Sequence, residues 1–89
     1  MMTFSVWKQY HPDGAWVLME SVCSEADCYS DNSLAYYIDS MKYGDKVAIL
    51  HISRVTYGMA ISKSEMRSAV EACCRSLMYD QDSDRWHIE

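Results

Sequence analysis

The chain has 89 residues, of which 49% are hydrophobic and 24% charged, and its formal net charge is −5. The length predicts a single domain over residues 1–89, and the composition is typical of a globular protein rather than a disordered one. No apolar run approaches the roughly 20 residues that a membrane span needs, and the N-terminus lacks the pattern of a secretory signal. We therefore expect a cytoplasmic protein with reduced cysteines.

The charge is spread unevenly along the chain. Residues 1–41 carry six acidic and one basic side chain, residues 42–75 three acidic and six basic, and residues 76–89 four acidic and one basic. The acidic total argues against direct binding to nucleic acid, whose phosphate backbone selects basic proteins. It favours a basic surface on another protein as the partner, although the same charge would also keep a protein without partners in solution.

A β-hairpin is predicted at the N-terminus. Residues 3–10 and 15–23 are rich in β-branched and aromatic residues, and the first run alternates between two faces. The sequence Pro12-Asp13-Gly14 between them favours a tight turn, because proline presets φ and glycine accepts a positive φ.

A helix is predicted over residues 34–44, after an acidic loop over residues 24–33. Its 3.6-residue period places four residues on one apolar face, namely Leu34, Tyr37, Ile38 and Met41. Asp31, Asn32 or Ser33 can cap its N-terminus, and Gly44 is placed to end it.

Residues 45–57 are predicted to form a central strand that is covered on both sides, because apolar residues occupy both of its faces. One face carries Val47, Ile49, His51 and Val55, and the other carries Ala48, Leu50 and Ile52. We expect His51 to be a hydrogen-bonded core residue.

A second helix is predicted over residues 62–80, where Ser62 and Glu65 have the spacing of a capping box. On this helix Cys73 falls within the apolar stripe and Cys74 at its edge, so we interpret both as packed residues rather than as zinc ligands or a disulfide. A short last strand is predicted over residues 85–89. The predicted fold class is α+β: a small antiparallel or mixed sheet packed with two helices, in the order β-β-α-β-α-(β).

No catalytic or cofactor signature is present. The chain lacks G-x-S-x-G, P-loop, G-x-G-x-x-G and H-E-x-x-H motifs. Cys23 and Cys28 form a C-x4-C pair, which is wider than a zinc knuckle, and we expect Cys23 to pack. The D-x-D-x-D run over residues 80–84 begins like a calcium loop, but Arg85 stands where glycine is needed. We therefore expect no enzyme activity, no metal and no cofactor.

The aromatic residues indicate an interaction surface. Seven tyrosines and three tryptophans exceed what so small a core needs, and both residue types supply much interface energy. The alternative is that the tyrosines only border the core, with their hydroxyls in water. We expect the acidic segment 25–39 and residues 79–84 to bind a partner through Glu25, Asp27, Tyr29, Asp31, Tyr36, Asp39, Tyr79, Asp80, Asp82 and Asp84.

In size, acidic charge and lack of catalytic motifs, the chain resembles the small single-domain accessory proteins of bacteriophages, including anti-CRISPR and anti-restriction inhibitors. The resemblance implies a non-enzymatic protein-binding module that blocks a larger, basic, nucleic-acid-handling protein in the bacterial host cytoplasm, and it assigns no residue roles.

The alternative function is a nucleic-acid or small-ligand binding domain. It would use the basic side chains of Lys42, Lys46, Arg54, Lys63, Arg67 and Arg75, three of which fall on the polar side of the second helix. Glu71 interrupts that basic face and is spaced to pair with Arg67 and Arg75 instead. A homodimer formed through the edge of the hairpin is also compatible with the sequence.

Overall fold

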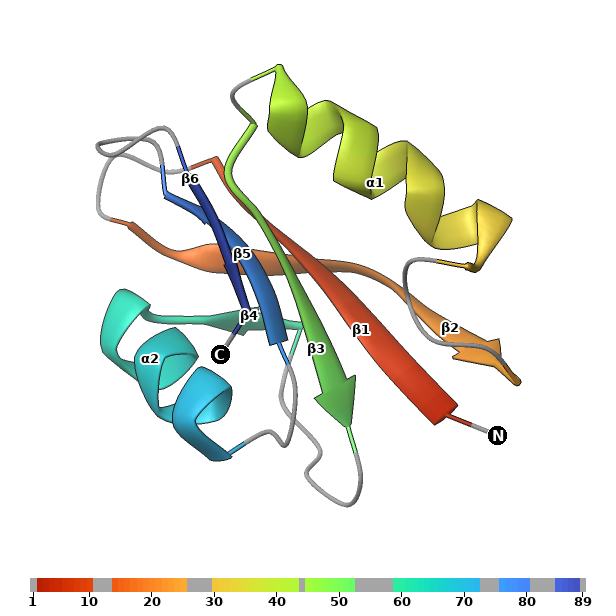
Figure 1. Cartoon of the computed structure of the whole chain (residues 1–89). Helices are drawn as coiled ribbons and strands as arrows, with labels where there is room; N and C mark the ends of the chain where they lie inside the picture. The colour runs from red at the N-terminus through yellow and green to blue at the C-terminus, as the bar shows by residue number, and fades with distance from the viewer. Residues whose placement is uncertain are drawn as a thin grey trace.

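The computed structural model describes residues 2–10, 14–25, 30–43, 45–52, 59–72, 76–80 and 85–88. One antiparallel sheet has the strand order β4-β2-β1-β3-β5-β6, and two helices lie on its opposite faces (Figure 1). The elements are β1 (Met2–Gln9), β2 (Trp16–Ser24), α1 (Asn32–Lys42), β3 (Val47–Ile52), β4 (Ala60–Ile61), α2 (Lys63–Ala72), β5 (Ser76–Asp80) and β6 (Arg85–Ile88). This architecture confirms the predicted α+β class.

The sheet separates two hydrophobic clusters, and the central strands contribute to both. In β3, Val47 and Ile49 pack on the side of α1, whereas Ala48 and Leu50 pack on the side of α2. The remaining buried residues of the first cluster are Phe4, Val6, Leu34, Met41 and Leu77; those of the second are Trp7, Trp16, Ile61, Met66, Ala69 and Val70. The prediction of a central strand covered on both faces is therefore confirmed over residues 47–50.

Both helices are capped by residues that the sequence predicts, although α1 spans Asn32–Lys42 rather than residues 34–44. The backbone N–H of Ser33 donates to Oδ1 of Asp31 over 2.7 Å, so Asp31 is the N-cap of α1. At α2, the N–H of Glu65 donates to Oγ of Ser62 and the N–H of Ser62 donates to Oε1 of Glu65, each over 3.1 Å. These reciprocal bonds form the predicted capping box.

The second helix is shorter than predicted. It ends at Ala72, and residues 76–80 form strand β5 instead, with Leu77 opposite Ile49 of β3. Leu77 is buried, and it reaches the core from a strand rather than from a helix. The prediction of a helix up to residue 80 was wrong because the apolar spacing suits both structures, and pairing with β3 decides between them. Residues 73–75, including both cysteines, lie outside the described residues.

The N-terminal hairpin and the last strand are confirmed, with two additions. Gly14 has φ 84°, as its predicted place in the turn requires, and Nε2 of Gln9 donates to its carbonyl over 2.9 Å. The outer edge of the hairpin is not wholly open, because the two-residue strand β4 pairs with Trp16 and Val17 of β2. The predicted end of the β3 strand at residues 53–57 lies outside the described residues.

A β-bulge at Met19 divides β2 between the two clusters. Leu18 lies opposite Trp7 and Glu20 lies opposite Val6, so Met19 has no partner on β1. Leu18 packs against the cluster under α2, whereas Val22, after the bulge, packs against the cluster under α1. Strict alternation would have kept Glu20 and Val22 on the same face as Leu18; the extra residue moves both to the α1 side of the sheet.

Candidate functional site

The structure separates Glu25 from Asp80, two acidic residues that the sequence analysis groups into one surface. Glu25 follows β2 at the end of the sheet where Met2 pairs with Ser24. Asp80 ends β5 at the opposite end, since Met78 already pairs with Ala48 near the beginning of β3. Glu25 and Asp80 therefore lie apart, whereas α1 runs toward the beginning of β3 (Figure 1). Of the remaining predicted residues, Asp27, Tyr29, Asp82 and Asp84 lie outside the described residues, as do the side chains of Tyr79 and Asp80.

Two of the predicted acidic residues on α1 have local partners. The Ser24 hydroxyl donates to the Asp31 carboxylate and lowers its pKa, and the backbone N–H of Ser33 acts in the same direction. Asp39 is exposed and lies 3.6 Å from Nζ of Lys42. Asp31 thus holds the start of α1, and the charge of Asp39 is balanced by its neighbour.

Exposed aromatic and sulfur-containing side chains gather on α1, just past the end of β1 and at the bulge of β2. Tyr10 is 61% exposed, Met19 41% and Tyr36 68%. The Tyr10 hydroxyl lies 3.7 Å from the Met19 sulfur, and the rings of Tyr36 and Tyr37 pack edge to face with 5.3 Å between centroids. Together with Glu20, these residues form what we call the tyrosine–methionine patch: Tyr10, Met19, Glu20, Tyr36 and Tyr37.

Tyr37 connects the helical and the sheet parts of this patch. Burial raises the pKa of its hydroxyl, and the negative charge of Glu20 and a hydrogen bond to that carboxylate raise it further; Tyr36 and Tyr10 add to the shift. Tyr37 therefore stays protonated at neutral pH and donates to Glu20. The bulge at Met19 allows the hydrogen bond between Tyr37 and Glu20, because it moves Glu20 to the face of the sheet on which α1 lies.

The sequence analysis identified Tyr36 but missed Tyr10, Met19 and Glu20. The signal was a charged residue within an apolar strand: in strict alternation Glu20 would share a face with Trp16 and Leu18. A carboxylate on the face that strict alternation turns toward the core predicts either a buried charge or a bulge. A bulge is the less costly of the two.

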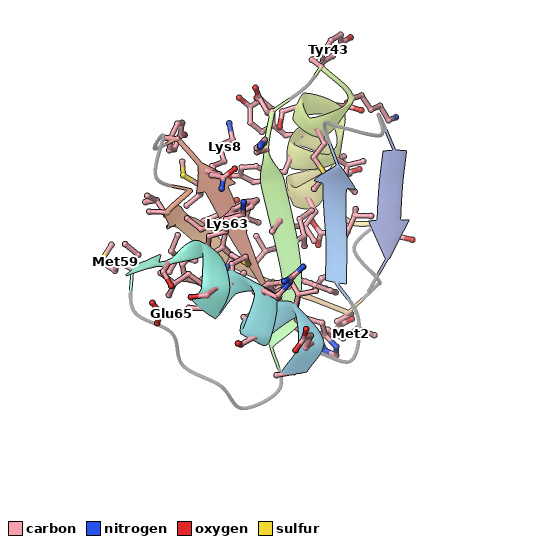
Figure 2. The ribbon with its side chains drawn as sticks, turned by 90° about the vertical axis from the view of Figure 1, so that its left-hand side faces the viewer. Met2, Lys8, Tyr43, Met59, Lys63 and Glu65 are labelled. Atoms are coloured by element: carbon pink, nitrogen blue, oxygen red, sulfur yellow. The ribbon has the colours of Figure 1, made fainter. Side chains whose placement is uncertain are left out.

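Other exposed hydrophobic side chains are scattered. Met59 lies at the margin beside β4, 75% exposed, and Tyr43 lies just past α1, 90% exposed, at the opposite end of the molecule from Met2 (Figure 2). Single exposed apolar residues of this kind are common on protein surfaces and do not define a site.

The exposed charges of α2 balance one another. Lys63 and Arg67 are accompanied by Glu65 and Glu71, all four exposed. Among the described residues the ion pairs are Lys8 with Asp45 and Lys42 with Asp39, so the predicted pair between Glu71 and Arg67 is not formed. Arg54 and Arg75 of the predicted basic set lie outside the described residues, and Lys46 is exposed before β3.

Two predictions about packed residues need correction. Cys23 is an exposed free thiol, with its sulfur 3.7 Å from Oγ1 of Thr3, and of the described helices α2 does not reach this end of β2 (Figure 1). His51 is half-buried rather than fully buried, and its ring lies 5.4 Å from that of Phe4. In the part of the chain that the structure describes, no three potential ligand side chains converge on a metal position. Cys28, Cys73 and Cys74 lie outside that part.

No helix among the described residues combines the length and the apolar character that crossing a membrane requires. Comparison with protein-family models, with curated proteins and with solved structures gave no match to this chain. Its function has therefore to be argued from its own geometry.

Proposed function

We propose that this protein is a non-enzymatic protein-binding module whose contact surface is the tyrosine–methionine patch. The observation that carries the proposal is the joining of Tyr10, Met19 and Tyr36, all well exposed, into one surface through Tyr37 and Glu20. Tyrosine and methionine are enriched at protein interfaces, whereas a surface without a partner carries few such groups in contact.

The patch combines apolar area with fixed polar groups. The rings of Tyr36 and Tyr37 hold each other edge to face, and the Tyr37 hydroxyl is held by Glu20, so a partner would order few additional side chains on binding. The bulge and α1 hold these groups on regular secondary structure rather than on a loop. Such preorganisation favours recognition of a protein surface.

The net charge of −5 supports a basic partner. In this proposal the protein is an inhibitor or accessory protein of the bacteriophage type, similar in action to anti-CRISPR or anti-restriction proteins, and it blocks a nucleic-acid-handling protein in the host cytoplasm. Its acidic total would steer it to the surface that normally receives nucleic acid.

The test is capture of partners from nuclease-treated bacterial lysate by tagged protein, with mass spectrometry of what stays bound in moderate salt. The double variant Tyr10→Ser/Tyr36→Ser removes two exposed rings of the patch, and Tyr43→Ser is the matched control, because Tyr43 is even more exposed but lies outside it. We expect a basic protein in stoichiometric amount with the native chain and with Tyr43→Ser, and its loss with the double variant. Equal capture by all three proteins, or capture by none, would contradict the proposal.

A further inference from the structure

Glu20 carries a negative charge that no cation of the described residues balances. The ion pairs in this part of the chain are Lys8 with Asp45, 3.6 Å, and Lys42 with Asp39, 3.6 Å. Lys8 projects from the same face of β1 as Val6, which lies opposite Glu20, yet its ammonium group is directed to Asp45. Glu20 is exposed, so its carboxylate is available to a cation from outside.

The surroundings of this carboxylate are aromatic. Tyr37 donates a hydrogen bond to it, the ring of Tyr36 packs against Tyr37, and Met19, the residue before Glu20, contacts the Tyr10 hydroxyl. A carboxylate accepts about four hydrogen bonds, so one bond from Tyr37 fixes its orientation and leaves room for a forked donor. A tyrosine ring attracts a cation placed over its face within about 6 Å.

From this arrangement we propose that the patch receives an arginine side chain of the partner, with the guanidinium group paired to Glu20 and stacked on the neighbouring tyrosine rings. Arginine suits the site better than lysine, because its planar group pairs with a carboxylate in a forked geometry and stacks on aromatic faces. The inference rests on the proposed function and names the chemistry that the surface recognises. Arginine-rich surfaces are typical of proteins that bind nucleic acid, which agrees with the proposed class of partner.

The direct test is a titration of isotopically labelled protein with a capped Gly-Arg-Gly peptide, followed by amide chemical shifts. The same peptide with citrulline keeps the shape without the charge, and a lysine peptide keeps the charge without the fork. We expect saturable shifts at the patch residues with the arginine peptide, weaker shifts with lysine and none with citrulline. Glu20→Gln should weaken binding by about threefold to tenfold, whereas Glu71→Gln, a matched change of an exposed glutamate on the opposite helix, should not.

Several outcomes would overturn the inference. Equal binding of the arginine and lysine peptides would show a response to charge alone, and equal effects of Glu20→Gln and Glu71→Gln would show a response to the overall field. The lysate capture separates the two proposals. A partner that is lost with Tyr10→Ser/Tyr36→Ser but kept by Glu20→Gln would leave the patch as an interface and refute arginine recognition. A partner kept by both variants would refute the patch itself.

Discussion

Deletion of a single residue tests the β-bulge that positions the patch. Removing one residue from the middle of a strand reverses the faces of every residue that follows, and this is usually severe in a sheet covered on both sides. Met19 is the exception, because it is the extra residue between the pairs Trp7–Leu18 and Val6–Glu20. Without it, Leu18 and Glu20 become neighbours on a regular strand and still point to opposite faces. We therefore expect the Met19 deletion to fold with both hydrophobic clusters intact.

The control is deletion of Ser5 in the neighbouring strand β1, which pairs regularly with both β2 and β3 from Thr3 to Val6. Without Ser5, Phe4 becomes the neighbour of Val6, moves to the opposite face and leaves the cluster under α1, where it is buried. This costs the burial of a phenylalanine side chain and the cavity that it leaves, about 3 kcal/mol. The Met19 deletion loses only a half-exposed side chain, about 1 kcal/mol.

Urea unfolding followed by tryptophan fluorescence measures both values, since Trp7 and Trp16 are buried in the cluster under α2. The expected order of stability is native chain, Met19 deletion and then Ser5 deletion, with a gap of about 1 kcal/mol or more between the two deletions. Equal losses for the two deletions, or a larger loss for Met19, would refute the bulge as the device that turns Glu20 and Val22 toward α1.

Three further predictions concern stability. Leu34→Ala empties the centre of the cluster under α1 and should lower the free energy of unfolding by about 3 kcal/mol in urea; a loss below about 1 kcal/mol would contradict this packing. Gly14→Ala forces φ 84° on a residue whose Cβ would lie 3.2 Å from Cδ of Lys63, so its cost should be about 1–2 kcal/mol, and an unchanged thermal midpoint would count against it. Hydrogen bonds lower the pKa of Asp31 and of Glu65. The stability that these carboxylates contribute is therefore present above their ordinary pKa and lost as pH falls through the lowered values. Thermal midpoints should show this loss in acid, and Asp31→Asn with Glu65→Gln should flatten the profile; an unaltered profile would refute the linkage.

Most of the fold could be predicted because local signals agree with the tertiary arrangement. The hairpin turn at Gly14, the N-cap at Asp31 and the capping box of Ser62 and Glu65 depend on neighbouring residues only, and all three are formed. The apolar residues on both faces of residues 47–50 predict a strand covered on both sides, because no other environment buries them all.

The errors lie where partners distant in sequence decide the structure. Residues 76–80 have spacing that suits a helix, but the free edge of β3 pairs with them as a strand. The two-residue strand β4 exists only because β2 offers it an edge, and a segment so short has no periodicity of its own. Pairing between segments is not encoded in any short window of sequence.

The candidate site was only partly predictable. Tyr36 was found from its place on the outer face of α1, whereas Tyr10, Met19 and Glu20 join it only through the bulge. Of the predicted acidic surface, Glu25 and Asp80 lie at opposite ends of the sheet, since the strand registers place them apart. A grouping based on charge along the sequence cannot reveal such a separation.

Site-specific photo-crosslinking tests the patch as a protein-binding surface most directly. A benzophenone amino acid is placed at position 36, within the patch, or at position 43, where Tyr43 is the most exposed aromatic residue of the described chain, and each protein is irradiated in bacterial lysate. We predict one dominant covalent adduct with a basic protein from position 36 and none of that mass from position 43. The same adduct from both positions, or no adduct from position 36, would contradict the account.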